Sequence, residues 1–263
     1  MKRILLFALA AVACLNGQSQ ECGERYNEAV FDEVKVTSDV LFGEAVQLLD
    51  VVGPTSNPLS PVKPVVATQK LYLDIYEPVG DGISERPLLI FAFGGAFVFG
   101  TKTDAYVVDL ATRYAKLGYV VAAIDYRLTR ELALAGLQLD PTVPIRAVLK
   151  GTHDMKAAIR FMRNSALNEG NPYSIDEKQI YAGGLSAGAF CALHAAYLDK
   201  LSELPEDILE YAMENGGIEG NSGTPGVSSA VAGVVSMSGA LGEANWLESG
   251  DVDAPMKRPL QRP

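Results

Sequence analysis

The segment Gly184-Leu185-Ser186-Ala187-Gly188 joins a strand-like run to an alanine-rich helical run with almost no loop between them. The apolar run at Gln179–Ala182 predicts the strand, and Ala187–Lys200 predicts the helix. A turn this short strains the backbone at the serine, and only small neighbours tolerate it; the glycines of the segment supply that room. The pattern predicts a strand–turn–helix unit with Ser186 exposed at the carboxyl end of a strand.

The alternation of strands and helices extends along the whole chain, with glycine, proline and serine marking the turns. Strands are expected at Phe31–Val40, Lys70–Tyr76, Leu88–Phe93, Tyr119–Asp125 and Val231–Met237, and helices at Ala105–Leu117 and Ile145–Asn168. Loops are expected at Val51–Pro64 and, over the sheet, at Asn215–Gly226, for which part of a substrate-covering cap is the alternative. Leu88–Phe93 is continuously apolar, as in a strand buried on both faces. The order predicts an α/β fold with a mostly parallel, doubly wound sheet.

The first residues have the pattern of a signal peptide. Lys2 and Arg3 precede an apolar run from Ile4 to Ala13, which is shorter than the roughly 20 residues that span a bilayer. We therefore expect residues 1–20 to be removed on export, a secreted or periplasmic protein, no integral membrane span, and one domain over residues 21–263. Ala-Val-Ala before Cys14 loosely resembles a lipoprotein cleavage site, so lipidation of Cys14 is an alternative.

Composition limits the ligands. The net charge is −10, and no stretch before the last few residues clusters Lys and Arg, which argues against nucleic acid and weakly favours neutral or cationic small molecules. No clustered Cys/His set implies a metal, and Gly94 and Gly95 lack the dinucleotide spacing, so no cofactor is expected. Cys191 is expected to be a buried thiol, whereas Cys22 has no evident partner and the oligomeric state is undetermined.

The exposed serine and one upstream loop together predict a chemistry. A serine hydroxyl is a poor nucleophile unless a histidine base, oriented by a carboxylate, activates it. Attack by Ser186 on an ester carbonyl would build negative charge on oxygen, and the backbone N–H groups of Gly95, Ala96 and Ala187 are the candidate donors for it. Phe97 and Phe99 are candidates to line an acyl pocket. A plain glycine turn ending a strand is the alternative interpretation of this loop.

Four segments carry a family resemblance. Residues 93–97 are similar to an H-G-G-G-F motif with Phe93 and Ala96 substituted, 125–128 to D-Y-R-L, 154–161 to D-x-x-A-A-x-R-F, and 184–188 to the nucleophile elbow. From about residue 31 to 256 the chain resembles the α/β-hydrolase superfamily, in its carboxylesterase or esterase–lipase branch. The resemblance implies an eight-stranded sheet and hydrolysis of carboxylic esters by a triad of Ser, Asp or Glu, and His.

The resemblance breaks after Met256, where the seventh strand should begin. Lys257–Pro263 contains two prolines and three cations, which cannot form a buried strand. The sequence therefore predicts a C-terminally truncated α/β hydrolase that lacks its last two strands together with the triad acid and histidine, and whose activity is impaired. The alternative is a non-catalytic protein of this fold, or an inert fragment.

The two histidines of the sequence are poorly placed as replacements. His194 lies two helical turns beyond Ser186, and His153 and Asp154 are adjacent on a helix and do not face each other. We expect packed or surface histidines, and structural hydrogen bonds or ion pairs for Asp125, Arg127 and Asp154.

Overall fold

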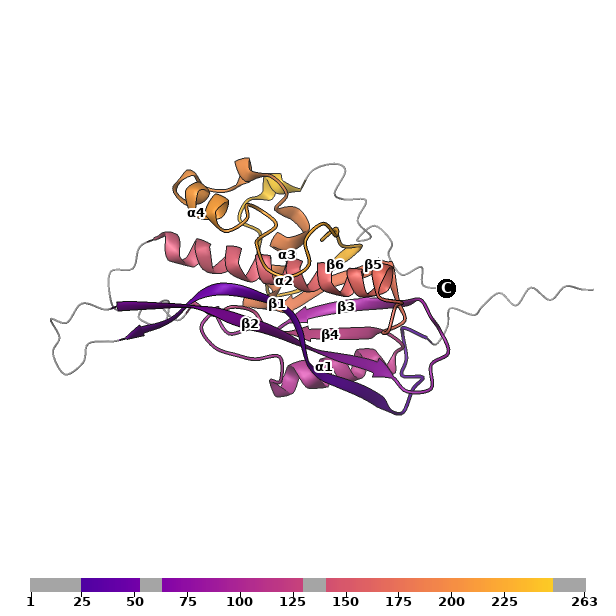
Figure 1. Cartoon of the computed structure of the whole chain (residues 1–263). Coiled ribbons are helices and arrows are strands. Elements are labelled where there is room, and N and C mark those ends of the chain that lie inside the picture. Colours follow the sequence, from indigo (N-terminus) through magenta and orange to yellow (C-terminus); the bar gives the residue numbers. More distant parts are fainter. Residues whose placement is uncertain (1–24, 53–62, 130–140, 248–263) are drawn as a thin grey trace, which may run out of the picture.

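One six-stranded sheet organises the residues that the computed structural model describes, namely 25–52, 63–129 and 141–247 (Figure 1). The strand order is β1-β2-β4-β3-β5-β6. The strands are β1 (Val34–Val52), β2 (Lys63–Pro78), β3 (Arg86–Ala92), β4 (Val120–Ile124), β5 (Ile175–Leu185) and β6 (Gly233–Met237).

The centre of this sheet is parallel. β3 pairs in parallel with β4 and β5, and β5 with β6, whereas β1 and β2 form an antiparallel pair that joins the sheet along β4. All seven residues of β3 are buried, as the continuous apolar run predicted. Ala92 pairs with Gly184, so the carboxyl ends of β3 and β5 lie side by side. The two segments after these strands therefore meet at one edge of the sheet.

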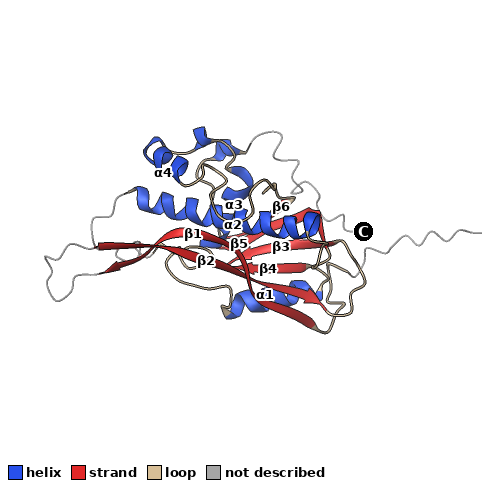
Figure 2. Cartoon of the chain, in the orientation of Figure 1, coloured by secondary structure: helices blue, strands red, loops and turns tan. Residues whose placement is uncertain are grey.

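Helices cover both faces of the sheet (Figure 1, Figure 2). The helices are α1 (Ala105–Lys116), α2 (Thr142–Asn168), α3 (Ala187–Tyr197) and α4 (Leu209–Glu214), with 3-10 turns η2 (Leu201–Glu203), η3 (Glu206–Ile208) and η4 (Ala244–Trp246). α1 packs on one face, and α2 and α3 pack on the other. The predicted α/β class with a mostly parallel, doubly wound sheet is confirmed. The predictions for the signal peptide and for the chain beyond Met256 concern residues outside the described ranges.

The first two strands are longer than the sequence predicted. β1 and β2 pair as far as Val52 with Lys63, so both ends of the expected loop Val51–Pro64 belong to strands. Pro64 is tolerated there because β2 pairs with β4 only over Leu73–Tyr76, which leaves Pro64 on an edge. Elsewhere the boundaries differ by a few residues, and α3 ends at Tyr197 rather than Lys200.

A row of basic side chains on α2 holds the segment 198–230, which we call the cap segment. Lys156 and Arg160 each pair with the carboxylate of Glu219, at 2.9 and 2.8 Å. Arg160 also donates to the carbonyl of Ser222 at 2.7 Å, and Arg163 donates to that of Ala230 at 2.5 Å. The glycine-rich loop therefore packs on α2, which presents donors to its carbonyl groups. It also meets the sheet, as expected, because a methyl group at Gly43 of β1 would lie 3.0 Å from Gly223 N.

Acid is expected to loosen the cap segment through Glu219. Burial alone would raise the pKa of this carboxyl group, but Lys156 and Arg160 outweigh it and hold the pKa below its ordinary value. The stabilisation is complete above the unfolded-state pKa and is lost as pH falls through the lower folded-state pKa. Because the carboxylate is half exposed, the effect should stay below about 1 kcal/mol.

Urea unfolding of the wild type and Glu219→Gln, at neutral pH and at about pH 3, measures this effect. The wild type should lose more stability between the two conditions than the variant does. Equal losses in the two proteins would contradict the assignment.

Candidate functional site

Ser186 occupies the turn between β5 and α3 in a conformation that non-glycine residues rarely adopt. Its φ is +50° and its ψ is −115°, and such a backbone costs about 1–3 kcal/mol. Hydrogen bonds hold it there: the Ser186 N–H donates to the Met237 carbonyl at 2.8 Å, and the Ser186 carbonyl accepts from Ala189 and Phe190. Ser186 itself is exposed. The structure thus places Ser186 at the carboxyl end of β5 and accessible from outside.

The glycines of the elbow are required by close contacts with backbone. A methyl group at Gly184 would lie 2.2 Å from the carbonyl carbon of Gly188. A methyl group at Gly188 would lie 2.1 Å from the carbonyl oxygen of Ala92, at the end of β3. The first turn of α3 therefore packs directly onto the ends of two strands, which is why the elbow is built from small residues.

Residues 93–97, which we call the 93–97 loop, lie beside the elbow. A methyl group at Gly94 would lie 3.0 Å from the Leu185 carbonyl oxygen and 3.4 Å from Ser186 Cβ. Gly95, Ala96 and Phe97 all have positive φ, at 130°, 53° and 61°. The chain therefore turns sharply next to the serine.

The N–H groups of this loop differ in their partners. Gly94 N–H donates to the Tyr106 hydroxyl oxygen at 2.6 Å. Among the described residues, Gly95 and Ala96 N–H have no hydrogen-bond acceptor. Ala187 opens α3, where N–H groups have no intrahelical partner. The N–H groups of Gly95, Ala96 and Ala187 can therefore donate to a bound oxygen, although their role as an oxyanion hole stays a prediction.

The two phenylalanines proposed for an acyl pocket lie in different surroundings. Phe97 is buried in the core, with its ring centroid 6.0 Å from that of Tyr126 in an edge-to-face arrangement. Phe99 is 67% exposed. Phe99 is thus accessible to a ligand, whereas Phe97 anchors the loop. Substrate binding by either residue stays a prediction.

The D-Y-R-L segment fixes the 93–97 loop and the residues just after that loop. The Asp125 carboxylate accepts from Lys102 N–H at 2.9 Å, and burial raises the pKa of this carboxyl group. Tyr126 donates its hydroxyl hydrogen to the Phe93 carbonyl at 3.0 Å, with the two rings stacked at 4.4 Å. These contacts confirm the structural role predicted for Asp125 and explain how a segment after β4 positions the loop after β3.

Arg127 and Asp154 form a buried ion pair between this segment and α2. The Asp154 carboxylate accepts from Arg127 N–H at 2.8 Å and from its guanidinium at 2.9 Å, and both side chains are at most 5% exposed. The structural role predicted for both residues is confirmed. Cys191 is a buried free thiol, also as predicted, and burial raises its pKa.

Backbone carbonyls hold both histidines. His153 Nε2 lies 2.8 Å from the Gly217 carbonyl, and burial lowers its pKa to about 4, so the ring is neutral near pH 7. His194 Nδ1 lies 2.9 Å from the Phe190 carbonyl, and burial lowers its pKa as well. In the described ranges, Ser186 makes no hydrogen bond to either ring.

Tyr106 is a site residue that the sequence did not suggest. It lies in the first turn of α1 and is 39% exposed, and its hydroxyl reaches back to Gly94. Burial raises its pKa, so the hydroxyl stays protonated near neutral pH. Because its oxygen accepts from Gly94, its hydrogen is left to donate to a ligand. Only the fold brings these residues together, so no local pattern could have found Tyr106.

Metal-ligating side chains do not gather in the part of the chain that the structure describes. No group of three or more His, Cys, Asp or Glu side chains there is placed to hold a metal ion. None of the helices in these same ranges combines the length and apolar character needed to cross a membrane.

Comparison with known proteins gives a family match, a curated relative and several similar solved structures. The family model BD-FAE matches residues 73–241. Gut esterase 1 of Caenorhabditis elegans is 30% identical over 119 residues, which are 45% of this chain and 19% of that protein.

Thermogutta terrifontis Est2 in its propionate-bound structure is 22% identical, with a TM-score of 0.46, covering 74% of this chain and 54% of that one. The same organism's esterase 2 phosphonylated by cyclosarin is 24% identical, with a TM-score of 0.46, over 66% of this chain and 53% of that one. The chain thus spans about a fifth of the curated relative and about half of these solved chains.

Proposed function

The chain belongs to the BD-FAE family, an α/β-hydrolase-like esterase family, and on this premise we propose that it hydrolyses carboxylic esters with Ser186 as the nucleophile. The observation that carries the proposal is the exposed serine held at a strained φ of +50°. Strain of this kind persists where the surroundings over-determine it, and it clusters at functional sites. The matched range 73–241 includes both the 93–97 loop and the elbow.

The proposed reaction has two stages. Ser186 Oγ attacks the ester carbonyl carbon, the bond from that carbon to the alcohol oxygen breaks, and the alcohol leaves with the proton that the serine hydroxyl gives up. Water then hydrolyses the acyl-serine to the carboxylic acid. The N–H groups of Gly95, Ala96 and Ala187 stabilise the oxyanion of each tetrahedral intermediate, and one such donor typically contributes about 2.7–4 kcal/mol.

A second candidate is a non-catalytic protein of this fold. The observation that favours it is the placement of the histidines, since His153 and His194 are bound to backbone carbonyls away from Ser186. Without a base the serine hydroxyl is a weak nucleophile. In triad hydrolases that lose a triad member, the oxyanion hole and binding still leave about 10³- to 10⁴-fold acceleration over water.

Labelling with a fluorophosphonate separates the two candidates. The wild-type chain should form a covalent adduct on the peptide that contains Ser186, and Ser186→Ala should not. Wild-type protein should also hydrolyse a p-nitrophenyl ester faster than Ser186→Ala does, because the variant keeps only the acceleration from the oxyanion hole and binding. Wild-type protein that is folded by circular dichroism, yet neither labelled nor faster than Ser186→Ala, would establish the non-catalytic alternative.

Tyr106→Phe should slow labelling of Ser186 by about tenfold while leaving the fold intact. The change removes the acceptor of Gly94 N–H and one O–H donor at the site, and leaving such a partner unpaired costs about 1–3 kcal/mol. The measurement is the second-order rate of labelling. Tyr114→Phe is the control, since Tyr114 lies on the same helix and contributes a ring contact to Tyr119. Equal rates for wild type and Tyr106→Phe would remove Tyr106 from the site.

We also propose that residues 1–20 direct export, giving a secreted or periplasmic protein. The support is the basic start followed by the apolar run Ile4–Ala13. Cell fractionation with N-terminal analysis should find a mature chain beginning between residues 14 and 21. A lipid-modified Cys14 would establish the lipoprotein alternative, and an intact Met1 in the cytoplasmic fraction would refute export.

A further inference from the structure

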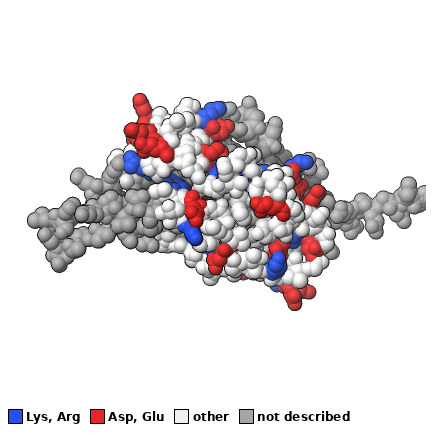
Figure 3. Space-filling model, viewed as in Figure 1, with Lys and Arg blue, Asp and Glu red and all other residues white. Residues whose placement is uncertain are grey.

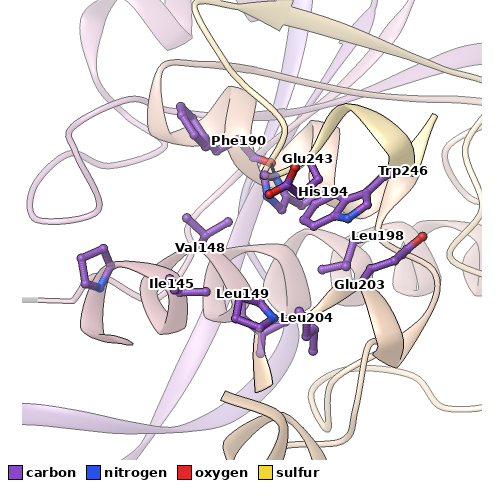
Figure 4. A pocket seen from close by; sticks show the side chains of 13 residues that line it. Ile145, Val148, Leu149, Phe190, His194, Leu198, Glu203, Leu204, Glu243 and Trp246 are labelled. Carbon is purple, nitrogen blue, oxygen red and sulfur yellow. Dashed lines mark hydrogen bonds between the residues drawn. The ribbon is translucent and has the colours of Figure 1, made fainter. Parts of the chain in front are cut away.

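An apolar cavity of about 330 Å³ lies between α2, α3 and the segment after β6 (Figure 4). Ile145, Val148 and Leu149 of α2 form one side of it. The rings of Phe190, His194 and Trp246 form the other. This volume is in the range of small-molecule sites and suits a group the size of a substituted ring.

His194 is the buried polar side chain of this cavity, 6% exposed, whereas Glu203 is half-buried and Glu243 is exposed. Its Nδ1 lies 2.9 Å from the Phe190 carbonyl, which can only accept, so Nδ1 carries the hydrogen. Burial lowers the pKa of His194, so the ring is neutral and Nε2 is a bare acceptor. Trp246 meets the ring edge-on at 5.2 Å, and no described residue donates to Nε2. The cavity thus offers an unused acceptor at a buried position, beside apolar side chains and apart from the more exposed carboxylates of Glu203 and Glu243.

The charges around the cavity select against acids. Glu203 and Glu243 are among its lining residues, and no Lys or Arg is among the described ones. Acidic side chains also gather over the neighbouring α4 on the face drawn in Figure 3. A ligand carboxylate would meet the like charges of the two glutamates and the bare Nε2 acceptor. A ligand ammonium group would lose its hydration among apolar side chains. A neutral ligand with a hydrogen-bond donor meets neither penalty.

We propose that this cavity is a binding site for a neutral, apolar alcohol whose hydroxyl donates to His194 Nε2. The alcohol can be a free molecule or a hydroxyl-bearing arm of an ester substrate. The substrate arm as the source rests on the proposed function. The cavity is near enough to Ser186 for this, because its lining residue Phe190 lies one helical turn beyond Ser186 on α3.

The fluorescence of Trp246 reports occupancy, because Trp246 is the single tryptophan of the chain and lines the cavity. We compare benzyl alcohol with toluene, which has the same ring without the donor. A wholly apolar cavity prefers toluene, since the alcohol must give up hydration. We expect saturable changes with benzyl alcohol bound at least fivefold more tightly. Tighter binding of toluene, or no saturable change with either, would overturn the proposal.

Two variants and a third probe sharpen the test. His194→Leu should reverse the preference so that toluene binds more tightly, and Val148→Phe, which fills the cavity, should weaken both ligands at least tenfold. If either variant does not fold, the wild-type comparison still decides. Benzylamine binding more tightly than benzyl alcohol would assign the site to cations and overturn the neutral alcohol.

Labelling of Ser186 distinguishes the two sources. If the alcohol is an arm of the substrate, benzyl alcohol should slow fluorophosphonate labelling with the same half-saturation as the fluorescence change. Unchanged labelling, with binding intact, assigns the cavity to a free alcohol. A wild-type chain that is neither labelled nor faster than Ser186→Ala refutes the proposed function, while the fluorescence measurement still tests whether the cavity binds the alcohol.

Discussion

Gly188→Ala is expected to destabilise the protein by about 3 kcal/mol and to abolish labelling of Ser186. Propensity alone predicts the opposite sign, because alanine is favoured over glycine within a helix by about 1 kcal/mol. Here the added methyl group would lie 2.1 Å from the Ala92 carbonyl oxygen and 2.5 Å from that of Phe93. These are backbone atoms at the end of the central strand, so α3 must move, and overpacking of this kind typically costs about 1–3 kcal/mol or more.

The displacement would also reach the site. Ser186 and the 93–97 loop lie on the two sides of the same contact, so moving α3 away from β3 separates the serine from Gly95 and Ala96. Urea unfolding and the labelling rate measure the two effects. Gly82→Ala is the matched control, because a methyl group there has no neighbour within 4 Å, and its stability should change by less than about 0.5 kcal/mol. A Gly188→Ala protein that is as stable and as reactive as wild type would refute the packing argument.

The strands and helices around the elbow could be predicted because each has a strong local pattern. The apolar run Leu88–Phe93 corresponds to β3, and Gly118 marks the end of α1. The length of β1 and β2 could not be predicted, since Val51–Pro64 has the composition of a loop and only cross-strand pairing extends the strands into it. The short α4 has too few turns for its apolar spacing to stand out.

The site residues also divide into those that a local sequence pattern predicts and those that only the fold brings together. Ser186, its flanking glycines and the 93–97 loop are contiguous in sequence, so turn chemistry identifies them. Tyr106 and Met237 act through contacts made across the fold, to Gly94 and to the serine's own N–H. Tyrosine and methionine are ordinary residue types. Both residues lie too far along the sequence from their contact partners for a helical or strand period to connect them. Contacts of this kind follow from strand order, which no single local pattern contains.

The second large effect is expected at Asp154. Asp154→Leu should destabilise the protein by about 3–5 kcal/mol, because the change leaves the guanidinium of Arg127 without its carboxylate partner, and Arg127 is only 4% exposed. It also removes the acceptor of Arg127 N–H, at 2.8 Å. Arg127 follows Tyr126, whose hydroxyl holds the Phe93 carbonyl, so the loss should extend to the labelling rate of Ser186.

The cost at Asp154 should come from the stranded charge more than from the lost attraction, and a double variant separates the two. In Arg127→Met with Asp154→Leu neither charge of this pair is left buried, so more than half of the lost stability should return, as for buried pairs replaced together. Asp109→Ala is the surface control: Asp109 pairs with Arg113 at 2.9 Å in an exposed setting, where about 0.5 kcal/mol or less is expected. If the double variant is as unstable as Asp154→Leu, the carboxylate acts through its bond to Arg127 N–H, and the segment after β4 is held by that hydrogen bond instead of by charge.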